Sequence, residues 1–277
     1  MLPRAVAMLL EPIYEEAFYN FSHGFRPGRS PPQALETFWQ EATGLGVRWV
    51  LEVDIRKYFD SVNRPHLLKL VGARIGEGVV LRLLSKWLHA GVMEDGQWHD
   101  EEAGTPQGGV LSPLLSNLDL HEVFDTGFAE VVRARRKGRV VAVRFADDLG
   151  MGFTPQQDAE RVSRVLFQRF EKYGLKLHPE KTRRVPFGRP EKGGLDGAPA
   201  HAPGPFDFLG FTHDWGRSRK GDWVIQRKTA AQRLRRTLTA IGDWGRLHGH
   251  RGMFEPFQRL VRKLDGHYAN RCQRKLG

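Results

Sequence analysis

The chain reads Val140-Val141-Ala142-Val143-Arg144-Phe145-Ala146-Asp147-Asp148-Leu149-Gly150-Met151-Gly152-Phe153 at its centre, and no other stretch of the 277 residues says as much about its structure. Apolar residues alternate with other residues on both sides of two adjacent aspartates, which is the pattern of two strands joined by a tight turn. Such a hairpin is anchored in a core and leaves Asp147 and Asp148 at its tip. The alternating apolar positions are Val141, Val143 and Phe145 in the first strand and Leu149, Met151 and Phe153 in the second.

Three carboxylates form a candidate metal site. Asp147 and Asp148 repel each other when both are ionised, so a cation between them would stabilise the pair. Asp is also a common turn residue, which is the simpler interpretation of the pair alone. A third carboxylate, Asp54, follows an apolar run at residues 48–53, where it could equally cap a helix. Together the three match the all-oxygen ligand set that holds two Mg²⁺ ions about 3.5–4 Å apart in phosphoryl-transfer enzymes.

Six segments of the chain, read in order, point to one family. They are residues 21–30 (Phe-Ser-His-Gly-Phe-Arg-Pro-Gly-Arg-Ser), 54–59 (Asp-Ile-Arg-Lys-Tyr-Phe), 104–113 (Gly-Thr-Pro-Gln-Gly-Gly-Val-Leu-Ser-Pro), 145–148 (Phe-Ala-Asp-Asp), 174–182 (Gly-Leu-Lys-Leu-His-Pro-Glu-Lys-Thr) and 208–211 (Phe-Leu-Gly-Phe). This series resembles the motifs of a reverse transcriptase and maturase of the bacterial group II intron type. Phe145 and His23 each stand where that family usually has tyrosine. The resemblance implies an α+β fold: a polymerase right-hand palm, built of an antiparallel sheet with helices, with partial fingers and a helical basic thumb.

The resemblance also implies an activity and its catalytic residues. The activity is RNA-directed DNA polymerisation, in which a primer 3′-hydroxyl is extended on an RNA template. Asp54, Asp147 and Asp148 would be catalytic and would hold two Mg²⁺ ions, with Ile55 offering a backbone carbonyl as a further metal ligand. Lys181 would donate a proton to the leaving pyrophosphate or stabilise its charge. A solvated surface lysine is the alternative for that position.

Further residues are implied to bind substrates. Phe59, Gln107 and Gly108 would contact the incoming deoxynucleoside triphosphate. Phe59 would act as the aromatic gate that rejects a ribose 2′-hydroxyl, although it or the neighbouring Tyr58 could instead be core. The residues implied to contact the DNA primer or the RNA template are Arg26, Arg29, Phe208, Leu209, Gly210, Phe211, Arg233, Arg236 and Arg262.

Family members carry a basic fingers region before the segment that begins this chain. We therefore expect a chain truncated at its N-terminus, with a dimer or a separate N-terminal fragment as a source of the missing part. The expected domains are residues 1–46 as the remaining fingers and palm entry, 47–215 as the palm, and 216–277 as the basic thumb. Residues 186–205 contain ten Gly or Pro residues and predict an exposed loop within the palm.

The charge is distributed unevenly. The net charge is +11, which favours a polyanionic partner such as template or intron RNA. Residues 1–215 hold 27 Lys and Arg against 28 Asp and Glu, whereas residues 216–277 hold 16 against 4. In that basic region, Leu234, Leu238, Ile241 and Trp244 have helical spacing, and a second apolar stripe follows at residues 254–268. This predicts a helical hairpin with a basic exterior.

Other patterns predict further elements and narrow the class of protein. Residues 92–94 and 97–99 flank Asp95-Gly96 as a second hairpin, and residues 155–173 have helical spacing. The single Cys272 excludes an internal disulfide or a zinc ribbon, and no apolar run is long enough for a membrane span. We therefore expect no membrane partner and a cytoplasmic, nucleoid-associated protein. Two other functions stay open: a catalytically inactive remnant that only binds RNA, and, less favoured, a nucleotide cyclase with a similar fold.

Overall fold

The computed structural model describes residues 1–89, 92–94, 97–99, 109–190, 203–248 and 261. The chain divides into two compact units, residues 1–202 and residues 203–277, and each is described by itself. Of the helices in the described ranges, none is long and apolar enough to cross a membrane. Helices and an antiparallel sheet share the first unit, as the sequence predicted for an α+β fold.

The first unit is built on a four-stranded antiparallel sheet with the strand order β4-β5-β1-β6. The predicted hairpin is β4 (Val140–Phe145) and β5 (Asp148–Phe153), and the run before Asp54 is β1 (Trp49–Val53). The edge strand β6 (Arg183–Pro186) pairs with β1. Strands that are distant in sequence therefore bring Asp54 beside the hairpin.

The two apolar stripes of the hairpin lie on opposite faces of the sheet. Phe145 pairs with Asp148, so Val143 lies opposite Gly150 and Val141 opposite Gly152. The partners of Leu149, Met151 and Phe153 are instead Arg144, Ala142 and Val140. This register follows from the two-residue turn, since side chains alternate between faces along a strand. Each stripe therefore faces a different core.

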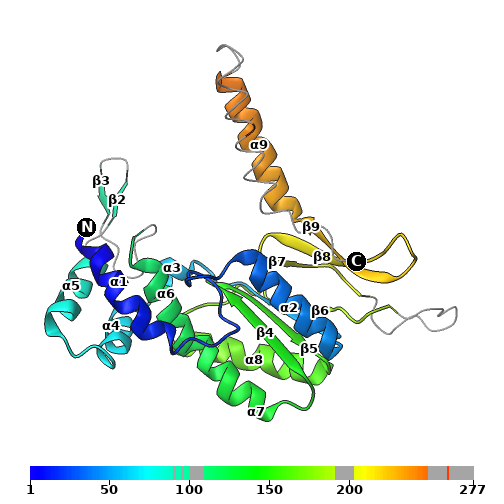
Figure 1. Ribbon diagram of the computed structural model, residues 1–277, viewed down its shortest axis with the longest axis horizontal. Helices are drawn as coiled ribbons and strands as arrows, with labels where there is room; N and C mark the ends of the chain where they lie inside the picture. Colours follow the sequence, from blue (N-terminus) through cyan, green and yellow to red (C-terminus); the bar gives the residue numbers. More distant parts are fainter. Residues whose placement is uncertain (90–91, 95–96, 100–108, 191–202, 249–260, 262–277) are drawn as a thin grey trace. The chain divides into compact units, whose positions relative to one another are not determined.

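Helices cover both sides of this sheet (Figure 1). The helix predicted at residues 155–173 is α8 (Gln156–Lys172), whose Val162, Leu166 and Phe170 join the main core with Leu51 and Met151. Helix α2 (Pro31–Leu45) packs against β4 and begins at a Ser30 cap. Its buried Leu35 and Phe38 belong to the other face, outside that main core.

The remaining helices of the first unit surround the main core. A long helix spans residues 112–135 and contains two π-helical stretches, which widen its turns. The α1 stripe Val6, Leu10 and Tyr14 is buried against this core. The helices are α1 (Leu2–Glu15), α3 (Tyr58–Ser61), α4 (Arg64–Gly72), α5 (Gly78–Leu88), α6 (Ser112–Leu120), η1 (His121–Asp125), η2 (Gly127–Val132) and α7 (Arg133–Arg135). The predicted second hairpin is confirmed as β2 (Val92–Glu94) and β3 (Gln97–His99), with its Asp95-Gly96 turn outside the described residues.

The second unit begins with the three-stranded antiparallel sheet β7-β8-β9. Its strands are β7 (Phe206–Phe208), β8 (Phe211–Arg217) and β9 (Trp223–Thr229), and α9 (Ala231–His248) follows. The expected boundary at residues 215/216 would cut β8, which pairs along its whole length with β9. The unit therefore begins earlier, at residue 203. Helix α9 includes the first predicted apolar stripe, whereas the second, at residues 254–268, lies outside the described residues except for residue 261.

Candidate functional site

The tip of the β4–β5 hairpin is a strained two-residue turn. Phe145 pairs with Asp148, so Ala146 and Asp147 are the two turn residues. Ala146 has φ of +56°, in the left-handed region that costs a residue with a Cβ roughly 1–2 kcal/mol. Such a conformation persists only where the surrounding structure fixes it, and it is common at functional sites.

The sheet register places Asp54 beside the turn. The last residue pair between β1 and β5 is Val53 with Leu149, so the next positions along the same register are Asp54 and Asp148. Residues directly opposite in an antiparallel pair have Cβ atoms about 4.5–5.5 Å apart. The two carboxylates therefore belong to one site although 94 positions separate them in the sequence.

The electrostatics of the three carboxylates reflect this proximity. Desolvation by the surrounding protein, the charge of Asp147 and then that of Asp54 raise the pKa of Asp148 to about 6. Desolvation, together with the charge of Asp54, also raises the pKa of Asp147. A divalent cation would relieve the same repulsion that favours protonation here.

The backbone of Asp54 is anchored by the segment at residues 176–182. The amide of Asp54 donates to Thr182 Oγ1 at 3.3 Å, and the Asp54 carbonyl accepts from the His178 amide at 2.8 Å. The Arg56 amide donates to the Lys176 carbonyl at 2.8 Å. These bonds flank Ile55 and do not use its carbonyl, which the sequence assigned to a metal. They also bring Lys181 to the site, with its Nζ 3.5 Å from Asp54 Oδ2.

The donor set fits Mg²⁺ by its chemistry. Asp54, Asp147 and Asp148 offer only oxygen ligands, which Mg²⁺ prefers, and their mutual repulsion favours a cation between them. In the described ranges, no group of three or more His, Cys, Asp or Glu side chains is gathered as a ready-made metal site. The fit therefore rests on the oxygen donors and on their electrostatic coupling.

The structure separates the roles of the two aromatic residues after Asp54. Tyr58 is buried, and its hydroxyl donates to the Ser116 carbonyl and to Asp119 Oδ2, each at 3.1 Å. Phe59 is only partly buried, and its ring packs edge-on against that of Tyr58 at 5.2 Å. Tyr58 is therefore the core residue, which leaves Phe59 available as the predicted gate.

The segment at residues 21–30 packs against the turn at Ala146 and Asp147. The His23 amide donates to the Arg144 carbonyl at 2.7 Å, and the Arg144 amide donates to the Phe21 carbonyl at 2.8 Å. Gly24 lies so close to the turn that an added Cβ would meet the Ala146 nitrogen at 2.0 Å. Backbone-to-backbone contact of this kind requires glycine, and it holds Ala146 in its strained conformation.

Arg26 and Arg29 were both predicted to contact nucleic acid, and the structure places them differently. Arg26 is buried, pairs with Glu15 at 2.6 Å, and donates to the carbonyls of Tyr19 and Ser22. These contacts favour an internal, structural role for Arg26 over a contact with template or primer. Arg29 is only partly buried, although its guanidinium donates to Asn20, so it stays a candidate for such a contact.

A buried ion pair beneath the turn escaped the sequence analysis. Arg144 and Asp125 are both fully buried, and Arg144 donates to the two carboxylate oxygens of Asp125 at 2.8 and 2.6 Å. Arg144 also donates to Asn117 Oδ1 at 2.9 Å and to the Ala146 carbonyl at 3.3 Å, while Asn117 donates to the Gly24 carbonyl at 2.7 Å. Burial opposes ionisation of Asp125, but Arg144 and His121 overcome this and hold the pKa of Asp125 below its usual value. An arginine inside an apolar strand was the signal that could have revealed this network.

The second unit holds residues predicted to grip the primer. Leu209 and Gly210 form the turn between β7 and β8, with φ of +52° and +76°, and Phe208 pairs with Phe211. The Arg233 guanidinium lies over the Phe211 ring at 5.9 Å and donates to the Leu209 carbonyl at 3.4 Å. Arg233 thus braces this turn, whereas Arg236 is exposed on α9. The predicted residues Gln107, Gly108 and Arg262 lie outside the described residues.

The fold and its carboxylates define a class of protein: a polymerase palm, in which an antiparallel sheet presents acidic residues at the end of one strand and at the turn of a hairpin. Residues 1–213 match the family model described as "Reverse transcriptase (RNA-dependent DNA polymerase)". The chain belongs to this family.

Curated relatives place the chain with the group II intron type. It is 44% identical over 123 residues to "Group II intron-encoded protein LtrA" of Lactococcus lactis subsp. cremoris, covering 44% of this chain and 20% of that protein. It is 42% identical over 125 residues to "Protein YkfC" of Escherichia coli (strain K12), covering 44% of this chain and 33% of that protein. The matched part of this chain thus spans a third or less of the length of these relatives.

Solved structures share the fold. A telomerase from Candida tropicalis matches with a TM-score of 0.59 at 12% identity, over 82% of this chain and 40% of that one. A telomerase from Candida albicans, solved with a fragment of telomeric RNA, matches with a TM-score of 0.54 at 15% identity, over 97% of this chain and 46% of that one. These likenesses confirm the right-hand polymerase fold.

Proposed function

We propose that this chain catalyses RNA-directed DNA synthesis of the group II intron type, extending the 3′-hydroxyl of a DNA primer on an RNA template. The observation that carries the proposal is the β1–β5 register, which ends at the Val53–Leu149 pair, so Asp54 and Asp148 are the next positions, beside Asp147 in the strained turn. Three carboxylates at the end of a polymerase sheet, with raised pKa values for Asp147 and Asp148, are suited to nucleotidyl transfer.

Different residues of the chain would hold the metal ions and select the nucleotide substrate. Asp54, Asp147 and Asp148 would hold two Mg²⁺ ions, which when bound supply activation of the primer hydroxyl and neutralisation of the leaving phosphate. Thr182 fixes the Asp54 backbone, so the carboxylate is positioned before substrate arrives. Phe59 would exclude a ribose 2′-hydroxyl by its ring.

Lys181 is assigned to the departing pyrophosphate. Its ammonium pairs with Asp54 in the structure, and both side chains are substantially exposed, so the pair is weak and easily exchanged. With Asp54 holding a divalent cation, the Lys181 ammonium would be free to reach a phosphate oxygen. It could then donate a proton or stabilise the developing negative charge.

The test is primer extension on an RNA template with the purified chain, comparing the wild type with Asp147→Asn. The variant is expected to lose Mg²⁺-dependent extension, while its affinity for RNA stays the same or rises slightly, because a negative charge near phosphate is removed. Asp60→Asn is the matched control, since Asp60 is an exposed carboxylate on α3 with no part in the site. Extension by Asp147→Asn at the wild-type rate would overturn the ligand assignment.

A second candidate is an RNA-binding protein without catalysis, which could assist intron splicing. The charge distribution favours it, since residues 216–277 hold 16 Lys and Arg against 4 Asp and Glu. No extension by the wild type, together with tight RNA binding, would favour this function. RNA affinity that survives removal of that basic region would count against it.

A further inference from the structure

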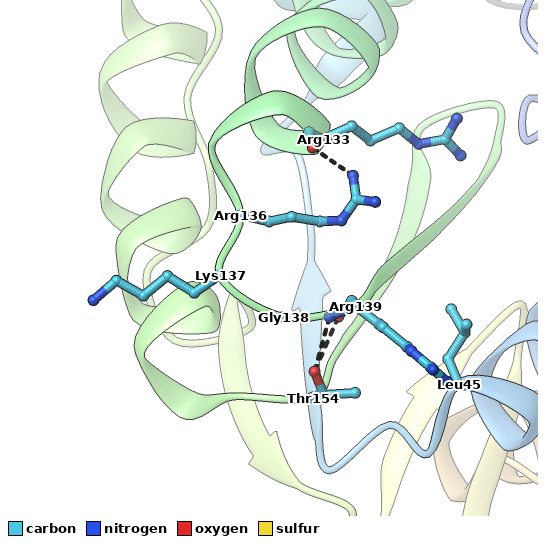
Figure 2. A pocket seen from close by; sticks show the side chains of 7 residues that line it. All are labelled: Leu45, Arg133, Arg136, Lys137, Gly138, Arg139 and Thr154. Atoms are coloured by element: carbon cyan, nitrogen blue, oxygen red, sulfur yellow. Dashed lines mark hydrogen bonds between the residues drawn. The ribbon is translucent and has the colours of Figure 1, made fainter.

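A basic pocket lies at the end of the palm sheet that is remote from the carboxylates. It has a volume of about 660 Å³ and is lined by residues 133 and 136–139 together with Leu45 and Thr154 (Figure 2). These residues surround the start of β4 and the end of β5, whereas the catalytic turn joins the other ends of the same strands. At about 3.3 Å per residue, roughly 20 Å of strand separates the two sites.

The loop that forms the pocket is held firmly by its own chain. The amides of Lys137 and Gly138 both donate to Asp158 Oδ2, at 2.9 and 2.8 Å. The Arg139 amide donates to Thr154 Oγ1 at 2.9 Å. A Cβ on Gly138 would approach Thr154 Oγ1 to 2.4 Å, so only glycine fits this close packing. The backbone that carries the arginines is therefore ordered by hydrogen bonds within the protein.

Three arginines extend to the same side of this loop. In Figure 2, the side chains of Arg133, Arg136 and Arg139 run to one side, whereas Lys137 runs to the other. The Arg133 guanidinium lies over the rings of Phe128 and Phe21, at 5.2 and 5.5 Å, and Arg136 donates a hydrogen bond to the Arg133 carbonyl. The side chains of Arg133 and Arg136 are thus positioned by contacts that do not use all of their guanidinium N–H donors.

The charge of the pocket is not balanced within its lining. Of the described residues that line it, none is Asp or Glu, and the nearby Asp158 oxygen already accepts two backbone amides. Basic side chains on a surface are commonly just solvated, but here three of them extend to the same side of a loop whose backbone is ordered by hydrogen bonds (Figure 2). Guanidinium groups are suited to phosphate because their planar donors can bind two oxygens at once.

We propose that this pocket binds the phosphate backbone of an RNA strand, with Arg133, Arg136 and Arg139 as its ligands, at a site separate from the polymerase centre. RNA is favoured over other polyanions because the chain belongs to a family that acts on RNA templates. Contacts of this kind position a strand without reading its bases. The site goes beyond the proposed polymerase activity and does not require it.

The test compares two double variants that each remove two positive charges from the first unit. Arg136→Gln/Arg139→Gln alters the pocket, and Arg161→Gln/Arg164→Gln, on exposed positions of α8, is the matched control. Binding of a single-stranded RNA is followed by fluorescence anisotropy over a range of KCl concentrations. Each phosphate contact contributes about 0.7 to the slope of log K against log salt for single strands. The pocket variant is therefore expected to bind about tenfold more weakly at low salt and to have a slope shallower by about 1.4.

The control is expected to keep the wild-type slope, and both variants should keep the wild-type unfolding temperature. An unchanged slope in the pocket variant, or an equal change in the control, would overturn the proposal. So would arginine-dependent binding of anionic lipid vesicles without any change in RNA binding. Competition by millimolar inorganic phosphate that matches the loss of RNA binding would assign the pocket to a small anion instead.

The same variants separate this proposal from the polymerase function. At saturating primer and template, Arg136→Gln/Arg139→Gln is expected to extend primers at the wild-type rate, whereas Asp147→Asn is not. Loss of extension with unaltered RNA affinity would overturn the pocket assignment and leave the catalytic assignment intact.

Discussion

The buried ion pair beneath the turn at Ala146 and Asp147 gives the sharpest stability prediction. Asp125→Asn keeps the shape of the side chain but removes the negative charge that compensates Arg144. Both side chains are fully buried, and two short hydrogen bonds join them. The amide would also present an N–H group to one of the Arg144 donors, so one of those hydrogen bonds would be lost.

Removing one partner of a buried pair costs about 3–5 kcal/mol, because the remaining charge stays in the interior without compensation. That is a large share of the roughly 5–15 kcal/mol that stabilises a typical domain. For a unit of this size we expect the unfolding temperature to fall by roughly 6–20 °C. Urea unfolding followed by circular dichroism would measure the loss, and calorimetry would give the temperature.

Two further variants test whether the loss of stability comes from the buried ion pair. Glu160→Gln breaks the exposed pair with Arg184 (2.9 Å), and we expect it to leave the urea midpoint unchanged. Asp125→Leu/Arg144→Met replaces the buried pair by apolar side chains, and we expect it to recover most of the lost stability. It should still extend primers poorly, because the bond from Arg144 to the Ala146 carbonyl is gone.

A loss of less than about 1 kcal/mol in Asp125→Asn, the value typical of an exposed pair, would show that Asp125 and Arg144 do not act as a buried ion pair. Wild-type primer extension by the apolar double variant would refute the separate claim that Arg144 positions the turn.

Three other changes test separate parts of the molecule. Phe59→Ala is expected to let the enzyme incorporate ribonucleotides, measured by primer extension with ribo- against deoxynucleoside triphosphates; unchanged discrimination would assign Phe59 to packing alone. Gly210→Ala places a Cβ 2.5 Å from the Arg233 guanidinium at φ of +76°, so we expect it to lower the stability of the second unit by roughly 1–2 kcal/mol in urea, and an unchanged midpoint would contradict this. Burial and the charges of Arg29 and Arg26 lower the pKa of His23 to about 4, so folding favours the neutral imidazole. The stability that this contributes to the folded protein is fully present above about pH 6.5, and it is lost as the pH falls toward 4. Between pH 7 and pH 5 the free energy of unfolding is expected to fall by about 2 kcal/mol because of His23. His23→Phe should therefore flatten the pH dependence of urea unfolding, and an unchanged pH dependence in this variant would contradict the prediction.

Local patterns predicted the elements whose signals are contained in a few residues. The hairpin at residues 140–153, the helix at residues 155–173 and the first helix after residue 230 all agree with the structure. The helix at residues 112–135 was not predicted, because its π-helical stretches break the regular 3.6-residue spacing on which such a prediction depends. The basic pocket at residues 133–139 was also missed, since the nearly equal numbers of acidic and basic residues before position 216 conceal a local cluster.

The sequence by itself determined the family and the hairpin with its two aspartates, and it pointed to Asp54 as their partner. The order of the motifs and the alternation of apolar residues can be read along the chain without knowledge of distant contacts. Only the tertiary structure decided which side chains meet. The register paired Val53 with Leu149, which makes Asp54 and Asp148 the next positions, and it sent the two apolar stripes to opposite faces. Burial turned Arg26 inward and left Phe59 partly exposed while Tyr58 entered the core. These outcomes depend on pairing between residues far apart in the chain, and no local pattern contains that information.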